Sequence, residues 1–460
     1  MKSLRVIRCE APNPESVLDR ELKQFTAASP PELLVLVDFS LEIYWLPGGT
    51  YIPLVALYHL TRRQDGVRVC LSVSTPEAVA GDIPRNVDDQ WLDGLKLPWF
   101  ELGQPLRLRP TLIPKPWGQE IWYTGTEQRG VAAVTDGVRD VPLPWLLAVA
   151  PARLSHSLQR QLILLKILDP LPDEVFGDLY FELHREKREV YVVTDVNPQA
   201  WPDGVGAIRF GFNSSLRASY ADDRQFLSDY RAAIGAYRLI RRDMDSQLDA
   251  MRVRDGVGVN EPVEAATLKR WIAQLPDTLR KSERESRAAM DAFCGQLPLR
   301  VGDVVKVPTL VPHSLQHGVR TVEFQTPVYE RLILSFAQKV LTQADWDTEA
   351  ALSIVLIDPP PAEPFEQIDA ADGWVEERIV AFDDFEVRRL SLQPGAMREL
   401  RAPRDYALAM AVGGDIQLGE ITLAADEAVL LAPIWRGGRV VNPGTAPRAL
   451  LLAYPNMPAR

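Results

Sequence analysis

Residues 180–196 read YFELHREKREVYVVTDV, with three glutamates, a histidine and a lysine close together. Two runs rich in apolar residues flank the polar turn REKR, which is typical of two strands joined by a turn. Residues two apart in a strand point to the same face, so Glu182 and His184 are expected to project together. Glu189 begins the second strand and can approach that pair from its neighbour. The stretch therefore predicts either a metal site or a salt-rich surface hairpin.

The search for a further ligand is narrow, because the chain contains only five histidines. His313 follows a strand-like run and a proline-rich turn, and it is the preferred candidate; His317 is the weaker one. Carboxylate oxygens and imidazole nitrogens suit hard or borderline divalent ions, and Zn²⁺ takes four protein ligands or three plus water. We expect one divalent metal, Zn²⁺ before Mn²⁺ or Fe²⁺, bound by Glu182, His184, Glu189 and His313.

Length and charge bound what the chain can do. With 460 residues it is expected to form two to three domains. The formal net charge of −11, from 51 basic and 62 acidic residues, argues against nucleic acid or an anionic membrane as the main partner. The first residues, MKSLRVIRCEAPNPE, lack the apolar stretch of a signal peptide, and no apolar run reaches the ~20 residues of a membrane span. We expect a cytoplasmic protein whose three scattered cysteines are thiols.

Composition along the chain predicts its organisation. Short runs rich in β-branched and aromatic residues dominate, with one helix expected at HSLQRQLILLKIL (156–168). The segment 214–297 differs, because its apolar residues recur at helical spacing. We expect these parts: a β-rich N-terminal region of unknown role at 1–105; a metal-binding β-domain from 106–213 and 298–357; a helical insertion at 214–297; a proline-rich linker at 358–373; and a C-terminal β-domain without metal ligands at 374–460.

The spacing around the candidate ligands resembles the two motifs of the cupin superfamily. In the first motif Gly177 precedes Glu182-x-His184 by four residues, and a further four residues separate His184 from Glu189. In the second motif Gly302 and Pro308 precede His313. The departures are a carboxylate in place of the first histidine, Leu310 where a glycine is usual, and Val196 where the first motif often closes on glycine. This resemblance implies small jelly-roll barrels that hold a metal inside.

Longer stretches resemble type I phosphomannose isomerases over about 107–455. LIPKPWGQEIW (112–122) is similar to the opening signature of that family, and LLKILD (164–169) is similar to the strand before its metal motif. The resemblance implies the four ligands already named and two catalytic residues, Lys187 and Arg331. Glu182 departs from the glutamine of the family. Substrate-binding roles are expected for Lys115, Trp117 and Glu120, whose alternative role is to pack the mouth of the barrel.

The resemblance implies a mainly β fold of cupin barrels with a helical insertion and an added N-terminal region, α+β or β. It also implies an aldose–ketose isomerase that interconverts mannose 6-phosphate and fructose 6-phosphate through an enediol(ate), with a sugar phosphate as its small-molecule partner. Two alternatives remain. One is a metal-dependent cupin enzyme with another small substrate, and the other is a non-catalytic protein that binds metal or sugar.

Overall fold

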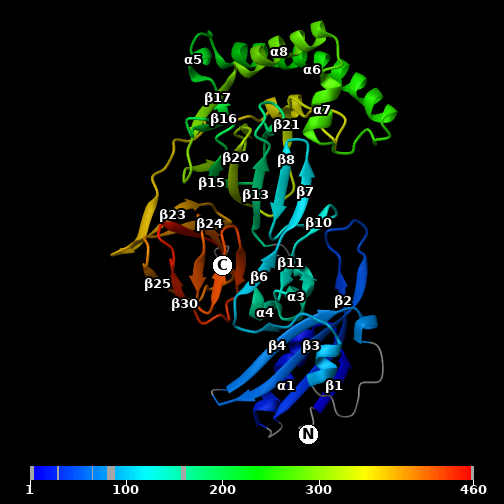
Figure 1. Cartoon of the computed structure of the whole chain (residues 1–460), viewed down its shortest axis with the longest axis vertical. Coiled ribbons are helices and arrows are strands. Elements are labelled where there is room, and N and C mark those ends of the chain that lie inside the picture. The colour runs from blue at the N-terminus through cyan, green and yellow to red at the C-terminus, as the bar shows by residue number, and fades with distance from the viewer. Residues whose placement is uncertain (1–4, 28–30, 65, 80–88, 157–161, 457–460) are drawn as a thin grey trace. The chain divides into compact units, whose positions relative to one another are not determined.

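The computed structural model describes residues 5–27, 31–64, 66–79, 89–156 and 162–456 (Figure 1). The chain divides into two compact units: unit 1 contains residues 1–111, 122–165 and 365–460, and unit 2 contains 112–121 and 166–364. The domain boundaries expected from the sequence remain a prediction, because the two compact units are divided at other residues. Among the described residues no helix is long and apolar enough to cross a membrane.

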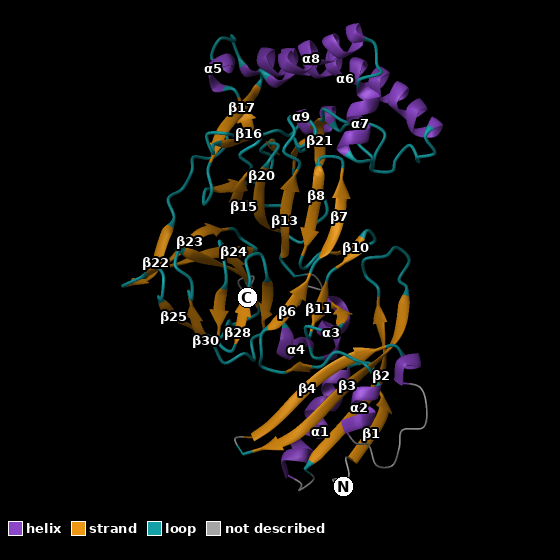
Figure 2. Cartoon of the chain, in the orientation of Figure 1, coloured by secondary structure: helices purple, strands orange, loops and turns teal. Residues whose placement is uncertain are grey.

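Unit 2 is built on two sheets, drawn as orange arrows in Figure 2. In sheet order, the six-stranded sheet contains β18 (Val304–Val307), β15 (Glu189–Val196), β20 (Val319–Gln325), β13 (Leu164–Pro170), β8 (Gly118–Trp122) and β7 (Thr111–Lys115). The five-stranded sheet contains β17 (Cys294–Leu299), β16 (Gly206–Phe212), β19 (His313–Leu315), β14 (Phe181–Leu183) and β21 (Leu332–Ser335).

A hydrophobic core fills the space between these two sheets. Tyr191 and Val193 enter it from the six-stranded sheet, and Ile208, Leu315 and Ile333 enter it from the five-stranded sheet. Alternate residues of each strand face this interior, as in other packed sheet pairs. The inward-facing side chains of the two sheets therefore meet in the interior of a small β-barrel.

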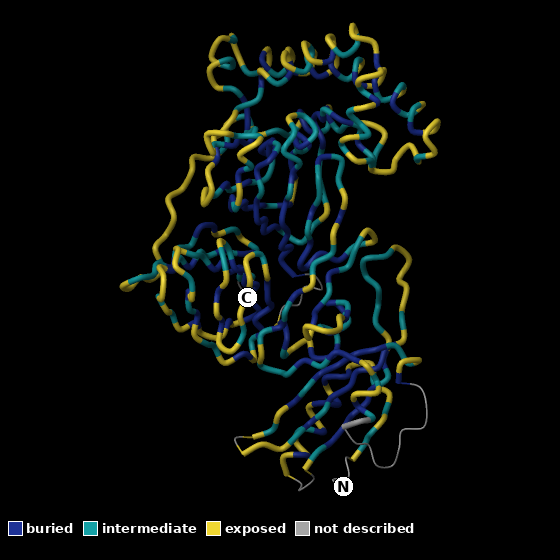
Figure 3. The backbone as a smooth tube through the Cα atoms, viewed as in Figure 1, coloured by how far each residue is buried: buried dark blue, intermediate teal, exposed yellow. Residues whose placement is uncertain are grey.

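Helices cover the outer face of the five-stranded sheet. They are α5 (Ser214–Arg217), α6 (Asp223–Arg254), α7 (Ala265–Ile272), α8 (Asp277–Asp291) and α9 (Thr348–Leu352), and the first four lie between β16 and β17. Phe226, Tyr230 and Ile234 form a buried stripe at four-residue spacing on α6. That stripe packs against Phe181 and Leu183 of β14. In Figure 3 one side of these helices is buried and the other side is exposed.

The helix predicted at 156–168 is wrong over its last residues. Residues Leu164–Pro170 form β13, in the middle of the six-stranded sheet; residues 157–161 lie outside the described part of the chain. A strand buried on both faces carries a continuous apolar run, and periodicity alone cannot distinguish such a run from a buried helix.

Unit 1 contains an N-terminal α+β part. Strand β1 (Arg5–Glu10) pairs in parallel with β2 (Glu32–Glu42), and α1 (Pro14–Ala27) makes the connection. A parallel pair requires such a crossover. The remaining elements of this part are β3 (Tyr51–Arg63), β4 (Gly66–Ser74), η1 (Pro76–Val79), α2 (Asp89–Gly94) and β5 (Phe100–Glu101).

The rest of unit 1 is a second β-structure around an apolar core that includes Leu390, Leu450 and Leu452. Its nine-stranded sheet combines strands from two distant segments. From the first segment come β6 (Leu106–Arg109), β11 (Ala133–Thr135) and β12 (Asp140–Pro142); β9 (Thr126–Glu127), β10 (Gly130–Val131), α3 (Leu143–Val149) and α4 (Pro151–Leu154) lie nearby in sequence. From the second come β22 (Glu366–Ala371), β23 (Trp374–Ala381), β24 (Phe385–Leu392), β26 (Ala407–Val412), β29 (Ala428–Leu431) and β31 (Arg448–Pro455). A four-stranded sheet adds β25 (Met397–Leu400), β27 (Ile416–Leu418), β28 (Ile421–Leu423) and β30 (Gly438–Val441).

Candidate metal centre

Two short strands place the first ligand pair. Glu182 of β14 lies opposite His313 of β19 in antiparallel register. Phe181 and Leu183 contribute to the core under the helices, as the alternation of a strand requires. Glu182 therefore has the opposite orientation, towards the barrel interior.

Glu189 reaches the same interior from the other sheet. It begins β15 and pairs with Val307 of β18 and Gln325 of β20 in the six-stranded sheet. The predicted hairpin is thus wrong, because the turn REKR connects strands of two different sheets. Its consequence for the site was nevertheless correct, since a strand in the facing sheet also directs its carboxylate inward.

His184, Glu189 and His313 form a compact cluster. Each offers one ligand atom, and the three atoms lie within 4.8 Å of one another. His184 Nε2 is 3.4 Å from Glu189 Oε1, and His313 Nε2 is 3.1 Å from Glu189 Oε2. All three residues are at most 2% exposed. Glu182 is adjacent rather than part of the tight group, with Oε1 3.8 Å from His184 Nε2.

Unsatisfied polar atoms show that the cluster fits a cation. Within the described part of the chain, both ring nitrogens of His184 and the Oε2 atom of Glu182 are buried without a hydrogen-bond partner, and buried polar atoms are rarely left in that state. His313 Nδ1 is 3.1 Å from the carbonyl oxygen of Val311, which can only accept, so Nδ1 carries a proton. In the neutral ring, Nε2 then directs a lone pair at the Glu189 carboxylate. A cation between these two atoms would relieve the repulsion.

Glu189 is the electrostatic centre of the site. Lys187 Nζ lies 2.6 Å from its Oε1, and the hydroxyl of Tyr191 donates to its Oε2 at 2.7 Å. Burial alone would raise the pKa of the Glu189 carboxyl, but the Lys187 ammonium lowers this pKa well below its usual value. Burial, followed by the Lys187 charge, lowers the pKa of His184. Both shifts favour the protonation states that metal ligands need.

Arg331 lies beside Glu182. Its Nη1 is 3.8 Å from Glu182 Oε2, its guanidinium carbon is 4.4 Å from the centre of the Tyr180 ring, and its Nη2 donates to Thr342 Oγ1 at 2.8 Å. The side chain is 23% exposed. The carboxylate of Glu330 instead accepts hydrogen bonds from the backbone N–H groups of Arg185 and Glu186. Arg331 is thus directed at the candidate metal ligands and remains partly open to solvent.

Sequence reasoning missed a second group of buried charges. Lys166 of β13 lies with Nζ 3.2 Å from Glu323 Oε2 of β20, and 3.9 Å from Glu120 Oε2 of β8. Lys115 Nζ is 3.1 Å from Glu120 Oε1. Burial raises the pKa of Glu323 to about 8, even though the Lys166 ammonium acts in the opposite direction. The sequence signal for this group was the position of Lys166 and Glu323 within apolar runs typical of strands. Charged side chains are rarely buried unless they are paired or functional.

The remaining candidates have different surroundings. Trp117 is 1% exposed and packs in the core between the sheets. His317 is not in the compact cluster: its Nδ1 lies 2.7 Å from Asp178 Oδ1, and its ring stacks on Trp201. Lys115 and Glu120 join the buried ion-pair group. The structure thus brings the predicted ligands, Lys187 and Arg331 together, and it separates His317 and Trp117 from them.

The backbone can be compared at two motif positions, Gly177 of the first motif and Leu310 of the second. A Cβ added at Gly177 would lie 1.9 Å from the carbonyl oxygen of Leu171, so only glycine fits there. Leu310, at the usual glycine position of the second motif, has a φ of 67°. Its N–H donates to the carbonyl oxygen of His184 at 2.7 Å. The second motif therefore keeps the left-handed turn of a glycine but makes it with a leucine, at a cost in strain.

Known structures with a similar fold are phosphomannose isomerases. The chain aligns with the mannose 6-phosphate isomerase from Bacillus subtilis at a TM-score of 0.51 and 12% identity, over 76% of this chain and 99% of that one. Two single-residue variants of phosphomannose isomerase from Salmonella typhimurium align at TM-scores of 0.53 and 0.52, with 12% and 11% identity, over 77% of this chain and 100% of each. No protein-family model and no curated protein sequence matches the chain.

At this identity the similarity establishes the fold. The predicted mainly β architecture of cupin barrels is confirmed, and the chain has a distant structural relationship to the phosphomannose isomerases. A common fold does not by itself establish a common reaction, because function depends on the site that the fold carries.

Proposed function

We propose that this protein is a metal-dependent aldose–ketose isomerase that acts on a sugar phosphate, of the type that interconverts mannose 6-phosphate and fructose 6-phosphate. The observation that carries the proposal is the buried cluster of His184, Glu189 and His313, with its unsatisfied nitrogens beside Lys187 and Arg331. The fold shared with phosphomannose isomerases supports the same reading.

The proposed metal ligands are Glu182, His184, Glu189 and His313. Two imidazoles and a carboxylate favour Zn²⁺, and the second carboxylate also suits Mn²⁺ or Fe²⁺. When bound, the cation would polarise sugar oxygens and stabilise negative charge that develops on them. A site with two carboxylates neutralises a divalent cation and weakens its Lewis acidity. Glu182 therefore makes metal binding a firmer part of the proposal than the rate of isomerisation.

Other side chains of this protein would provide the acid–base group and the anion-binding group that the reaction needs. Isomerisation moves a proton between C1 and C2 of the sugar, so a positioned acid–base group is needed. Lys187 is proposed for this role because its ammonium is buried at the cluster. Arg331, whose guanidinium is partly open to solvent, would bind the phosphate or the enediolate oxygens. Lys166 and Glu323 would help to balance the buried charge near the proposed metal ligands.

Substrate-binding roles for Lys115 and Glu120 remain part of the proposal. The Lys115–Glu120 ion pair lies next to Lys166. It would therefore bind the substrate as part of the same group of buried charges. For Trp117 the burial supports the alternative role, packing of the barrel.

One observation favours a second function. Arg331 already lies 3.8 Å from the Glu182 carboxylate, a charge that a glutamine at this position would not carry. An arginine held by an internal carboxylate is less available to a substrate anion. This arrangement suits a protein that binds a metal or a sugar without turnover.

A coupled assay for conversion of mannose 6-phosphate to fructose 6-phosphate tests the proposal. The purified chain is loaded with Zn²⁺, Mn²⁺, Fe²⁺ or Co²⁺ in turn, and metal content is measured in the same samples. We expect turnover with at least one ion, loss of turnover in Lys187→Met with metal retained, and normal turnover in the control Arg185→Met, whose side chain is exposed. Stoichiometric metal without turnover for any ion would replace the isomerase with the binding protein.

A further inference from the structure

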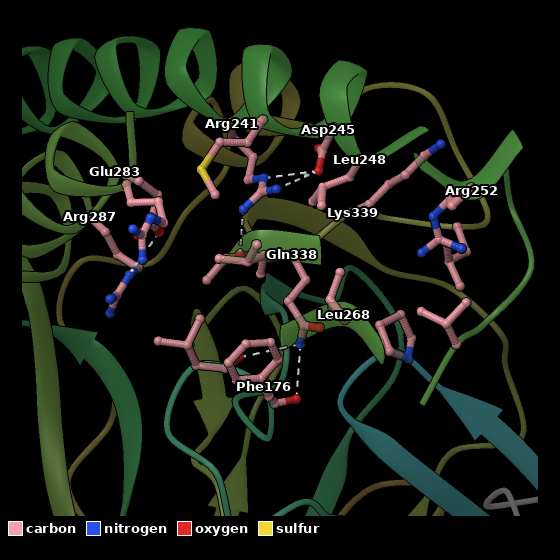
Figure 4. Close-up of a pocket in the computed structure, with 18 of the residues that line it drawn as sticks. Phe176, Arg241, Asp245, Leu248, Arg252, Leu268, Glu283, Arg287, Gln338 and Lys339 are labelled. Atoms are coloured by element: carbon pink, nitrogen blue, oxygen red, sulfur yellow. Dashed lines mark hydrogen bonds and ion pairs between the residues drawn. The ribbon is translucent and has the colours of Figure 1, made fainter. Parts of the chain in front are cut away.

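A cavity of 210 Å³ lies beneath the helices of unit 2 (Figure 4). Residues of α6, α7 and α8 line one part of it, and the segments around Phe176 and Gln338 line the other. Its lining residues do not include any of the four proposed metal ligands. The cavity is therefore a separate feature from the candidate metal centre.

One wall of the cavity is apolar. Met244 and Leu248 come from α6, Leu268 and Ile272 from α7, and Phe176 from the loop opposite. Met244 and Leu248 continue the buried stripe of α6 beyond the part that covers the sheet. A pocket with such a wall suits the body of a small organic molecule, because ligand sites are mostly apolar with a few polar groups.

The charged part of the lining is mainly basic. Among the described lining residues, six basic side chains face two acidic ones, in a chain whose net charge is −11. Both acids are engaged: Asp245 accepts hydrogen bonds from Arg241 at 3.0 and 2.7 Å, and Glu283 accepts one from Arg287 at 3.0 Å. The local charge therefore favours an anion.

Arg252 is a buried cation of this lining whose ion pair is long. It is 4% exposed, and its Nε is buried without a hydrogen-bond partner among the described residues. The nearest carboxylate, Asp249, is 3.8 Å away and is already bound by Lys339 at 2.7 Å. Nη1 donates to the backbone carbonyl oxygen of Glu261 at 2.5 Å. A buried cation that lacks a close counter-ion is costly, so an anionic group beside it would be stabilising.

Gln338 supplies an acceptor on the same cavity. Its Nε2 donates to the carbonyl oxygens of Val175 and Phe176, at 3.3 and 2.9 Å, which fixes the orientation of the amide. Its Oε1 is buried without a partner among the described residues. Figure 4 draws the hydrogen bonds from the amide of Gln338 to the segment that carries Phe176. A hydroxyl group of a ligand would satisfy it.

We propose that this cavity binds a small organic anion with an apolar, single-ring body and a hydroxyl group. The anion would pair with Arg252, the hydroxyl would donate to Gln338, and the ring would lie on the apolar wall. The cavity has a volume of 210 Å³. That space accommodates one ring with a short substituted chain. The inference is independent of the isomerase proposal.

Isothermal titration of the full chain with phenyllactate, which carries all three features, tests this site. We expect saturable binding, and weaker binding of phenylpropanoate, which lacks the hydroxyl, and of phenylethanol, which lacks the anion. Arg252→Met should weaken phenyllactate binding about tenfold or more, as for loss of one charge-assisted hydrogen bond. The matched control is Arg254→Met on the same helical turn, where an exposed arginine pairs with Asp255. This control should bind phenyllactate as the wild type does.

Two further measurements keep the test decisive. If Arg252→Met fails to fold by circular dichroism, Leu268→Trp, which fills the cavity from α7, takes its place and should abolish binding. Titrations are repeated with chelator-treated protein, which should bind phenyllactate normally. No saturable binding of phenyllactate, equal affinities in Arg252→Met and Arg254→Met, undiminished binding in Leu268→Trp, or loss of binding on chelator treatment would each overturn the proposal.

Discussion

The ion pair between Lys187 and Glu189 allows the electrostatics of the candidate centre to be tested without any metal. Nζ and Oε1 are 2.6 Å apart, and the two side chains are 9% and 2% exposed. At an effective dielectric constant of about 20, unit charges at 2.6 Å attract by about 6 kcal/mol before desolvation is counted. Removing one partner of a buried pair typically costs ~3–5 kcal/mol, because the other charge stays buried alone. Lys187→Met and Glu189→Gln should each destabilise the metal-free protein by about this amount.

The double variant should be far less destabilised than the sum of the two single variants. We expect a coupling free energy of ~3 kcal/mol, from urea midpoints at constant slope in the presence of a chelator. The control pair is Lys306 and Glu363, which lie 2.8 Å apart with 24% and 76% exposure. Its coupling should stay below ~1 kcal/mol, as for other exposed pairs. Equal coupling in the two cycles would refute the argument that Glu189 is held as a carboxylate by a buried ammonium.

Three other outcomes follow from the same geometry. His313→Ala should lose bound metal, measured by plasma mass spectrometry after gel filtration, whereas His317→Ala, which removes a partner of Asp178, should retain it. The pKa of Glu323 is raised from 4.5 to about 8, so its folded-state proton stabilises the protein below pH 4.5, and this contribution is lost as pH rises through 8. In chelator, the unfolding free energy of wild type relative to Glu323→Gln should therefore fall between these pH values; a constant difference would contradict the burial argument. Leu310→Gly should raise the unfolding free energy in urea by up to ~1 kcal/mol, because it relieves the left-handed backbone of Leu310; a lower unfolding free energy would show that leucine packing outweighs the strain.

Much of the site was readable from the sequence because it depends on local rules. The period of two in a strand places Glu182 on the inner face while its neighbours Phe181 and Leu183 meet the helices. The spacing to Glu189 and the position of His313 after a turn are also local features. What local rules could not provide was the pairing: β14 and β15 belong to facing sheets, not to one hairpin. That information depends on long-range hydrogen bonds, which residue spacing does not encode.

The buried charges behind the ligands were harder to predict for a related reason. Lys166 lies in the apolar run of β13, which periodicity assigned to a helix, and its partner Glu323 is more than a hundred residues away in β20. Neither charge taken alone indicates its partner, because Lys166 and Glu323 occur in separate apolar runs. Only the sheet order, with β20 and β8 on either side of β13, shows that Lys166 and its acidic neighbours must neutralise one another in the interior.

Glu182 is the residue at which the metal and the reaction can be separated. As a carboxylate beside His184 it would add negative charge to the ligand set, which would strengthen electrostatic attraction for a cation and weaken that cation as a Lewis acid. The same carboxylate lies 3.8 Å from Arg331, so part of its charge is balanced by the guanidinium rather than directed only at the metal position. This sharing offsets the excess negative charge and moderates the loss of Lewis acidity. Under the proposed function, a substrate anion would compete with Glu182 for Arg331, so this carboxylate would affect substrate binding and catalysis together.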